Sequence, residues 1–252
     1  MAGQTDLAGT IDKALELLFH LHEQGGAARG VSELGRELEL PKSTAHRLLA
    51  SLARRGLVEQ DARGRYQPGI ALLALGLGVL EREPLVAAAR PSLEQLAEDL
   101  GETIFLSSAR AGRLYVIDKQ EGDGFLRAAP RVGAEIPAHA TAIGKLYLAF
   151  APDLLRASDE PLQRFGRSTI VDPGALAREV EQVRARGWAG MREEWIPSLA
   201  GIAVPLRSGG RLLGALAAAG PSAHFDGVHE EVFRTRLLDA ARGIELRLGG
   251  KR

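Results

Sequence analysis

The sequence contains no cysteine, which excludes disulfide bonds, thiolate metal sites and cysteine nucleophiles together. It also lacks an excess of charge. Because 32 Lys and Arg residues balance 32 Asp and Glu residues, any basic patch for nucleic acid has to be local. The N-terminus has no basic start followed by an apolar run, and the uncharged stretch over residues 66–80 is too short to span a membrane. We therefore expect a cytoplasmic protein.

The chain has enough apolar residues, 45% of 252, for two ordinary domains or one large domain. Its first 68 residues predict three helices and a small hairpin. The first helix is expected to end near residue 25 and to carry one apolar stripe made of Ile11, Leu15, Leu18 and Phe19, followed by Leu21 or His22. The second is expected to begin beside Ser32, an N-cap residue, and to turn Leu34 and Leu38 inward.

The third helix is predicted by the stretch "PKSTAHRLLASLARRG", residues 41–56, in which the proline suits a helix start and the glycine ends it. Its buried face is expected to consist of Ala45, Leu48, Leu49 and Leu52. Two short extended pieces follow, at 57–60 and 65–67, around an Asp-Ala-Arg-Gly turn. Three helices and a hairpin in this order are typical of a winged helix-turn-helix.

Basic residues are concentrated in this part of the chain. Between positions 41 and 65 the sequence has six basic and two acidic residues, which is a local excess of four positive charges. A recognition helix presents its N-terminal side chains to base edges, while neighbouring cations hold phosphates. The candidate base readers are Ser43, Thr44, His46 and Arg47. The candidate phosphate or wing contacts are Lys42, Arg54, Arg55, Arg63 and Arg65. The alternative is an ordinary helical pair with a solvated basic face.

The second part of the chain changes from apolar helix to strand. Residues 69–90 are too apolar for a free surface helix, and we expect them to pack against a partner chain as a linker that ends near Pro91. Ser92 and Gln95 have the pattern of a capping box for the next helix. Strand-like segments then fall at 103–109, 113–120, 124–129, 188–194, 201–205 and 212–219, and helical ones at 141–150, 173–186 and 227–248. The predicted fold class is α+β, with an antiparallel sheet in the second domain.

The segment "HATAIGKL", residues 139–146, contains a Gly-Lys pair like that of a phosphate-binding loop. That motif requires glycine where His139 stands and serine or threonine where Leu146 stands, so both anchors are missing. The segment instead predicts a helix start that Thr141 can cap. Such a start would attract an anion or carboxylate to the amides of Ala142, Ile143 and Gly144. Plain capping without a ligand is the alternative.

Catalytic and metal-binding patterns are weak. His224, Asp226 and His229 have a spacing that resembles a metal site, but without further nearby ligands they indicate a loop and a helix start. No serine stands in a nucleophile elbow, and no acid and base have a spacing that demands catalysis. We therefore expect no metal site, no cofactor and no enzymatic activity.

Several segments together resemble the IclR family of bacterial transcriptional regulators over nearly the full chain. They are "VSELGRELELPKSTAHRLLASLARRGLVEQD", "YQPGIALLALG", "IPAHATAIGKLYLA", "GIAVPLRSGGRLLGALAAAGP" and the helical C-terminus. The resemblance implies a winged helix-turn-helix DNA-binding domain over 7–68, a helical linker and dimerisation segment over 69–90, and a GAF-like effector-binding domain over 91–249. It also implies homodimers, often paired into tetramers, on palindromic operators in double-stranded DNA.

The resemblance also implies an effector pocket around the 139–146 segment. Its walls would come from Phe125, Ala128, Ile136, Ala142, Ile143, Gly144, Met191, Leu199, Gly201, Ala217 and Ala219. Relatives that sense small carboxylic acids usually have an acidic residue in place of Met191, a glycine in place of Ser198, and hydroxyl residues in place of the last two alanines. Because burying an unpaired carboxylate against methionine and alanine is costly, we expect an apolar or aromatic carboxylic acid rather than a small keto acid.

Together these features predict a ligand-responsive transcriptional regulator, a repressor rather than an activator. One alternative is a constitutive DNA binder whose second domain only oligomerises, with Phe125, Met191 and Trp195 filling the pocket. The other is an enzyme tethered to DNA that uses His139 with Glu193 or Glu194 as acid and base.

Overall fold

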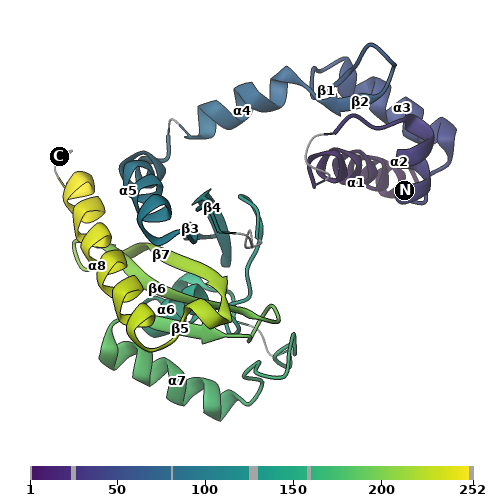
Figure 1. Cartoon of the computed structure of the whole chain (residues 1–252). Coiled ribbons are helices and arrows are strands. Elements are labelled where there is room, and N and C mark those ends of the chain that lie inside the picture. Colours follow the sequence, from purple (N-terminus) through teal and green to yellow (C-terminus); the bar gives the residue numbers. More distant parts are fainter. Residues whose placement is uncertain (1, 24–26, 81, 125–129, 158–159, 250–252) are drawn as a thin grey trace. The chain divides into compact units, whose positions relative to one another are not determined.

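The computed structural model describes residues 2–23, 27–80, 82–124, 130–157 and 160–249 (Figure 1). The chain divides into two compact units, residues 1–82 and 83–252. Within the described residues, no helix combines the length and the apolar character needed to cross a membrane.

The first unit is a winged helix-turn-helix followed by a fourth helix. It consists of α1 (Ala2–Glu23), α2 (Val31–Glu37), α3 (Lys42–Ala53), the strands β1 (Val58–Gln60) and β2 (Tyr66–Pro68), and α4 (Ile70–Leu80). The two strands pair antiparallel, and a bridge between Arg29 and Tyr66 ties the hairpin to the loop before α2. The prediction of three helices and a hairpin is confirmed.

Helix α1 buries only part of the predicted stripe. Leu17 and Leu21 are fully buried, whereas Ile11, Leu15 and Phe19 are 54%, 44% and 61% exposed. Residues four apart stack above one another on a helix, so these two sets lie on different faces. The predicted stripe therefore mixes two faces: Leu21 lies in the core and Leu18 packs against it, while the other three side chains are exposed. The helical period alone does not tell which of two apolar faces meets the other helices.

Helix α2 begins earlier than predicted. Gly30 is its N-cap, and the Glu33 side chain accepts a hydrogen bond from the Gly30 amide at 3.3 Å, which places Ser32 inside the first turn. Helix α3 follows the prediction and begins after Pro41. Its buried residues are Ala45, Leu48, Leu49 and Leu52.

The second unit contains a five-stranded antiparallel sheet with helices on both faces (Figure 1). The strands are β3 (Thr103–Arg110), β4 (Arg113–Gln120), β5 (Ala189–Arg192), β6 (Leu199–Ser208) and β7 (Arg211–Pro221), in the spatial order β4-β3-β7-β6-β5. The helices are α5 (Pro84–Leu100), α6 (Ala142–Phe150), α7 (Pro173–Arg186) and α8 (Gly227–Gly249), with short 3-10 turns at Pro152–Leu154 and Ser222–His224. The predicted α+β class is confirmed. The strand predicted at 124–129 lies, apart from its first residue, outside the described residues.

Alternate strand residues supply two separate cores. Ile104 and Ala218 pack with α5 and α8, whereas their neighbours Phe105 and Ala217 pack with α6 and α7. This alternation follows from the two-residue period of a strand. On the α6 side, β6 and β7 carry mainly glycine and alanine, such as Gly201. These small side chains leave space between the sheet and α6.

Helix α5 continues through Pro91, where the sequence predicted the end of a linker helix. The predicted single helix over 69–90 is in fact divided between α4 and α5. Ser92 is not an N-cap: its hydroxyl accepts a hydrogen bond from Arg247 of α8 at 2.5 Å, and Gln95 donates to Asp99 at 2.9 Å. Packing against α8 therefore stabilises a helix that proline alone would interrupt.

Candidate DNA-binding helix and effector pocket

Helix α3 presents a polar face at its N-terminal end. Lys42, Ser43, His46 and Arg47 are exposed, and Thr44 is partly buried. Ser43, His46 and Arg47 are spaced by three and four residues and therefore project from one side of the helix. The opposite side packs against α1 and α2. This arrangement can lay the exposed side chains along a groove of DNA.

Two of the predicted phosphate contacts lie at the other end of α3. Arg54 follows Lys42 by about 18 Å along the helix axis, at 1.5 Å per residue. Arg54 and Arg55 are both exposed, and Arg54 donates a hydrogen bond to the Ser51 hydroxyl at 3.0 Å. Their position suits a phosphate at a distance from the bases that the first turn of α3 would meet.

The turn of the wing is organised by Asp61. Its carboxylate accepts hydrogen bonds from the amides of Arg63 at 2.8 Å and Arg65 at 2.9 Å, and from the Arg65 side chain at 2.9 Å. The Arg65 amide, followed by the Arg65 side chain, lowers the pKa of Asp61 below its ordinary value. Arg65 is therefore engaged within the turn, while the exposed Arg63 is the wing residue better placed for DNA.

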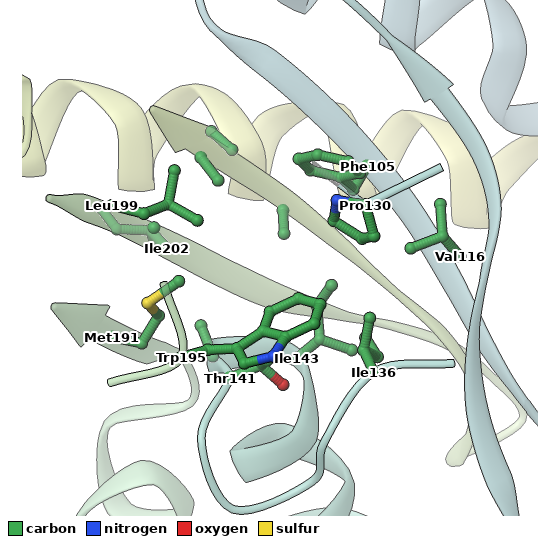
Figure 2. A pocket seen from close by; sticks show the side chains of 15 residues that line it. Phe105, Val116, Pro130, Ile136, Thr141, Ile143, Met191, Trp195, Leu199 and Ile202 are labelled. Atoms are coloured by element: carbon green, nitrogen blue, oxygen red, sulfur yellow. The ribbon is translucent and has the colours of Figure 1, made fainter. Parts of the chain in front are cut away.

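The second unit contains a cavity between the sheet and the first turn of α6 (Figure 2). The space open to the centre of a water-sized molecule is about 40 Å³, well below the about 300–1,000 Å³ of typical small-molecule sites. Counted together with the open solvent at its mouth, the space not filled by atoms is about 410 Å³. The described residues that line it have uncharged side chains, and they are Phe105, Val116, Pro130, Ile136, Thr141, Ala142, Ile143, Met191, Trp195, Leu199, Gly201, Ile202, Ala217, Ala218 and Ala219.

Most residues predicted for the effector pocket line this cavity. They are Ile136, Ala142, Ile143, Met191, Leu199, Gly201, Ala217 and Ala219. Gly144 is not among the lining residues, because it faces the backbone of Ala138. Phe125 and Ala128 lie outside the described residues. A ligand-binding role for these residues stays a prediction.

Sequence reasoning did not select Phe105 as a pocket residue, and it named Trp195 only as a side chain that would fill the pocket in the constitutive alternative. Phe105 is paired with Ala217 across β3 and β7, so the cross-strand register is the signal that could have found it. Trp195 lies in the turn between β5 and β6, where no periodic pattern assigns a direction to its side chain.

Apart from the Trp195 indole N–H, the polar groups on the described wall of the cavity belong to the start of α6. Thr141 is the N-cap, as predicted. Its hydroxyl accepts a hydrogen bond from the Gly144 amide at 3.0 Å and donates to a backbone carbonyl at 2.8 Å. The Lys145 amide donates to the Thr141 carbonyl oxygen at 3.0 Å. The amides of Ala142 and Ile143 are therefore the ones that the first turn leaves without an intrahelical acceptor.

Lys145 is buried and paired. Its ammonium group donates to Oε1 of Glu194 at 2.6 Å and to the carbonyl oxygen of Gly190 at 3.2 Å, and its side chain is only 2% exposed. The pair joins α6 to the segment that contains Met191 and Trp195, which both line the cavity. This geometry, like the missing anchors, argues against a phosphate-binding role for the Gly-Lys pair.

The residues of the enzyme alternative have other partners. His139 donates from Nε2 to the carbonyl oxygen of Gln163 at 2.8 Å and stacks on Phe165. Glu193 accepts a hydrogen bond from the Ser222 hydroxyl at 2.8 Å. Glu194 forms the buried ion pair with Lys145 described above. Each proposed acid or base therefore already forms a hydrogen bond or an ion pair with another group of the fold.

The His-Asp-His spacing does not build a metal centre. His224 forms a hydrogen bond with Glu102 at 2.6 Å, while His229 lies 3.5 Å from Asp226. In the part of the chain that the structure describes, no three His, Asp or Glu side chains are grouped closely enough to hold a metal ion.

Both parts of the chain match family models. Residues 10–62 match the IclR helix-turn-helix domain, and residues 77–246 match the bacterial transcriptional regulator IclR C-terminal domain. The chain belongs to the IclR family.

Individual IclR-family proteins are similar over almost the whole chain. The HTH-type transcriptional regulator BhcR of Paracoccus denitrificans is 31% identical, over 96% of this chain and 88% of its own length. The HTH-type transcriptional repressor AllR of Escherichia coli is 28% identical, over 97% of this chain and 92% of its own length. A crystal structure of an IclR homolog from Microbacterium hydrocarbonoxydans complexed with 4-hydroxybenzoate has a TM-score of 0.75 and 27% identity, covering 94% of this chain and 100% of that chain. The named relatives are transcriptional regulators, which confirms the predicted class of protein.

Proposed function

We propose that this IclR-family protein is a ligand-responsive repressor that binds palindromic operators. In this proposal residues 7–68 bind DNA, residues 69–90 link and dimerise, and residues 91–249 bind the effector. The observation that carries it is the exposed row Ser43, His46 and Arg47 on α3, combined with an uncharged cavity in the other unit. A ligand changes DNA affinity only if it binds the DNA-competent and DNA-incompetent arrangements unequally. That AllR is a repressor supports the proposed direction of regulation.

A second copy of the chain is the proposed partner of α4. This helix has no buried residue, and its apolar side chains at Ile70, Leu73, Leu75, Leu77, Val79 and Leu80 are 40–69% exposed. Contiguous apolar surface of this kind is unfavourable in water and marks an interaction site. A two-fold dimer matches the symmetry of a palindromic operator, and pairing of dimers into tetramers belongs to the same proposal.

Binding to DNA from the region upstream of the protein's own gene tests the function as a whole. Fluorescence anisotropy would compare that fragment with a scrambled copy across a salt series. We expect tighter binding to the native fragment that persists at physiological salt. Equal binding to both fragments that disappears as salt is raised would mean that the protein binds DNA only through electrostatic attraction to phosphates. That result would contradict a sequence-specific regulator acting on this upstream DNA.

Arg47 and Lys42 are expected to contribute in different ways. Arg47→Ala should weaken operator binding by about 1–3 kcal/mol and random-sequence binding much less, because Arg47 is placed among the base readers. Lys42→Ala should weaken binding to both DNAs and lower the salt slope by about one, as expected for one lost phosphate contact. The same anisotropy assay measures both variants. Equal losses on the two DNAs for Arg47→Ala would move that residue to the phosphate contacts.

The proposed effector is an apolar or aromatic carboxylic acid. The cavity offers an apolar wall and the two free amides of α6, and a related structure contains 4-hydroxybenzoate. A thermal-shift screen should therefore show stabilisation by aromatic acids, by about 2.7 kcal/mol when the ligand is at 100 times its Kd, and little effect of glyoxylate or pyruvate. Stabilisation by the keto acids with aromatic acids inert would reverse the assignment. No response to any acid would favour the constitutive DNA binder.

A further inference from the structure

Trp195 is held in place by the backbone around it. It lies in the turn after β5, where the Glu193 amide donates to the Leu199 carbonyl oxygen at 2.7 Å. The Thr169 hydroxyl donates to the carbonyl oxygen of Glu194 at 2.6 Å. These bonds fix the chain on both sides of the tryptophan. The indole is therefore presented to the cavity from a defined position.

The indole group brings an unused hydrogen-bond donor to the cavity. Figure 2 shows the ring of Trp195 on one side, with Phe105 and Pro130 across from it, and the indole nitrogen toward Thr141 at the start of α6. No residue of the described chain accepts a hydrogen bond from this N–H. Buried tryptophan N–H groups usually have a partner, and Trp195 is only partly buried. Its N–H is therefore free to bond to a molecule in the cavity.

A carboxylate in this cavity would otherwise be poorly compensated. Among the described residues that line it there is no lysine, arginine or histidine, and Trp195 is the one with a side-chain N–H. The Thr141 hydroxyl already donates one hydrogen bond and accepts another within the fold. In the described part of the cavity wall, the remaining donors are the amides of Ala142 and Ile143. Hydrogen bonds to a charged acceptor are roughly twice as strong as neutral ones, so a third donor has a large effect on which ligands are retained.

Building on the proposed function, we propose that Trp195 determines specificity by recognising the carboxylate of the effector. Its Nε1–H donates to the carboxylate that also meets the two amides at the start of α6. The apolar body of the ligand then lies among the remaining, uncharged side chains of the cavity. A neutral analogue of the same shape gains much less from this contact, so the site prefers the acid.

The test compares 4-hydroxybenzoate with 4-hydroxybenzamide, measured by titration calorimetry on the full chain. Trp195→Phe keeps an aromatic ring and removes the N–H. We expect it to weaken acid binding about 10- to 100-fold and amide binding only about 2- to 10-fold, from the strengths of charged and neutral hydrogen bonds. Trp188→Phe is the matched control. Trp188 packs with the core on the α8 side, under the Arg186 guanidinium at 4.3 Å from the ring centre. Trp188→Phe should leave the affinities for the acid and for the amide unchanged.

Fluorescence gives a second readout, because the chain has only two tryptophans. The acid should change the emission of Trp188→Phe, which retains Trp195, and leave that of Trp195→Phe unchanged. If the unsubstituted protein binds the acid and Trp195→Phe binds it with the same preference over the amide, the inference on Trp195 is overturned while the proposed effector class stands. If the unsubstituted protein binds no aromatic acid, the effector class and the inference fail together.

Discussion

Replacing Gly144 with alanine is expected to lower the free energy of unfolding of the C-terminal unit by about 3 kcal/mol or more. A Cβ at this position would lie 2.1, 2.3 and 2.5 Å from the O, Cα and C atoms of Ala138. These are backbone atoms, so the clash is relieved only if α6 moves away from the segment before it. Because Ala142 and Ile143 share the first turn with Gly144, such a movement would also deform the cavity.

Thermal unfolding of the full chain, followed by circular dichroism, measures this effect. A loss of about 3 kcal/mol corresponds to a decrease of about 6–12 °C in Tm for a unit of this size. Gly243→Ala is the matched control: Gly243 lies within α8, and its Cβ would be 3.7 Å from Nη1 of Arg247, an ordinary contact. Alanine is favoured over glycine there by about 1 kcal/mol. An unchanged Tm for Gly144→Ala would show that the close approach to Ala138 is not rigid.

The Gly-Lys pair shows how far local sequence reasoning reaches. The absence of both anchor residues was enough to reject a phosphate-binding loop, and the Thr141 cap was correctly predicted. The actual roles of the pair depend on distant parts of the chain. Gly144 is needed because the chain passes close at Ala138, and Lys145 is needed because Glu194, 49 residues later, is buried beside it. Neither neighbour is indicated by the spacing within the segment.

Sequence analysis was most accurate for helices whose ends are determined by their own capping residues. Helix α7 has the predicted bounds, with an N-cap from Asp172, a proline in its first turn and Gly187 at φ 81° after its last residue. The same holds for the buried face of α3. In both helices the apolar period and the terminal residues agree, so no tertiary contact is needed to decide between alternatives.

The errors occurred where tertiary contacts decide. Pro91 is normally a reason to end a helix, yet α5 continues because Arg247 of α8 bonds to it at Ser92 and Ala88. The predicted stripe on α1 was assigned without knowing which face would meet α2 and α3. Its exposed side, with Ile11, Leu15 and Phe19, adds apolar surface to the same unit as α4. This surface supports the proposed dimer.

Replacing Lys145 with methionine is expected to lower the free energy of unfolding by about 3–5 kcal/mol, because it leaves a buried carboxylate without its cation. Glu194 is only 8% exposed, and within the described residues its Oε2 has no hydrogen-bond partner. Oε1 is bonded to the Lys145 ammonium at 2.6 Å. The lysine is therefore the main compensation for the buried charge. Urea unfolding of the full chain measures the loss.

The double variant Lys145→Met/Glu194→Leu separates charge from packing. Replacing both members of a buried pair with apolar residues of similar size is often neutral or stabilising, so the double variant should recover most of the stability lost in Lys145→Met. Arg242→Met is the exposed control. It removes the pair with Asp239, whose side chains are 72% and 59% exposed, and should cost less than about 1 kcal/mol. A double variant as unstable as Lys145→Met would mean that the loss does not come from an unpaired Glu194 carboxylate. The hydrogen bond from the Lys145 ammonium to the Gly190 carbonyl oxygen at 3.2 Å would then be the contact that joins α6 to β5, next to Met191 at the cavity.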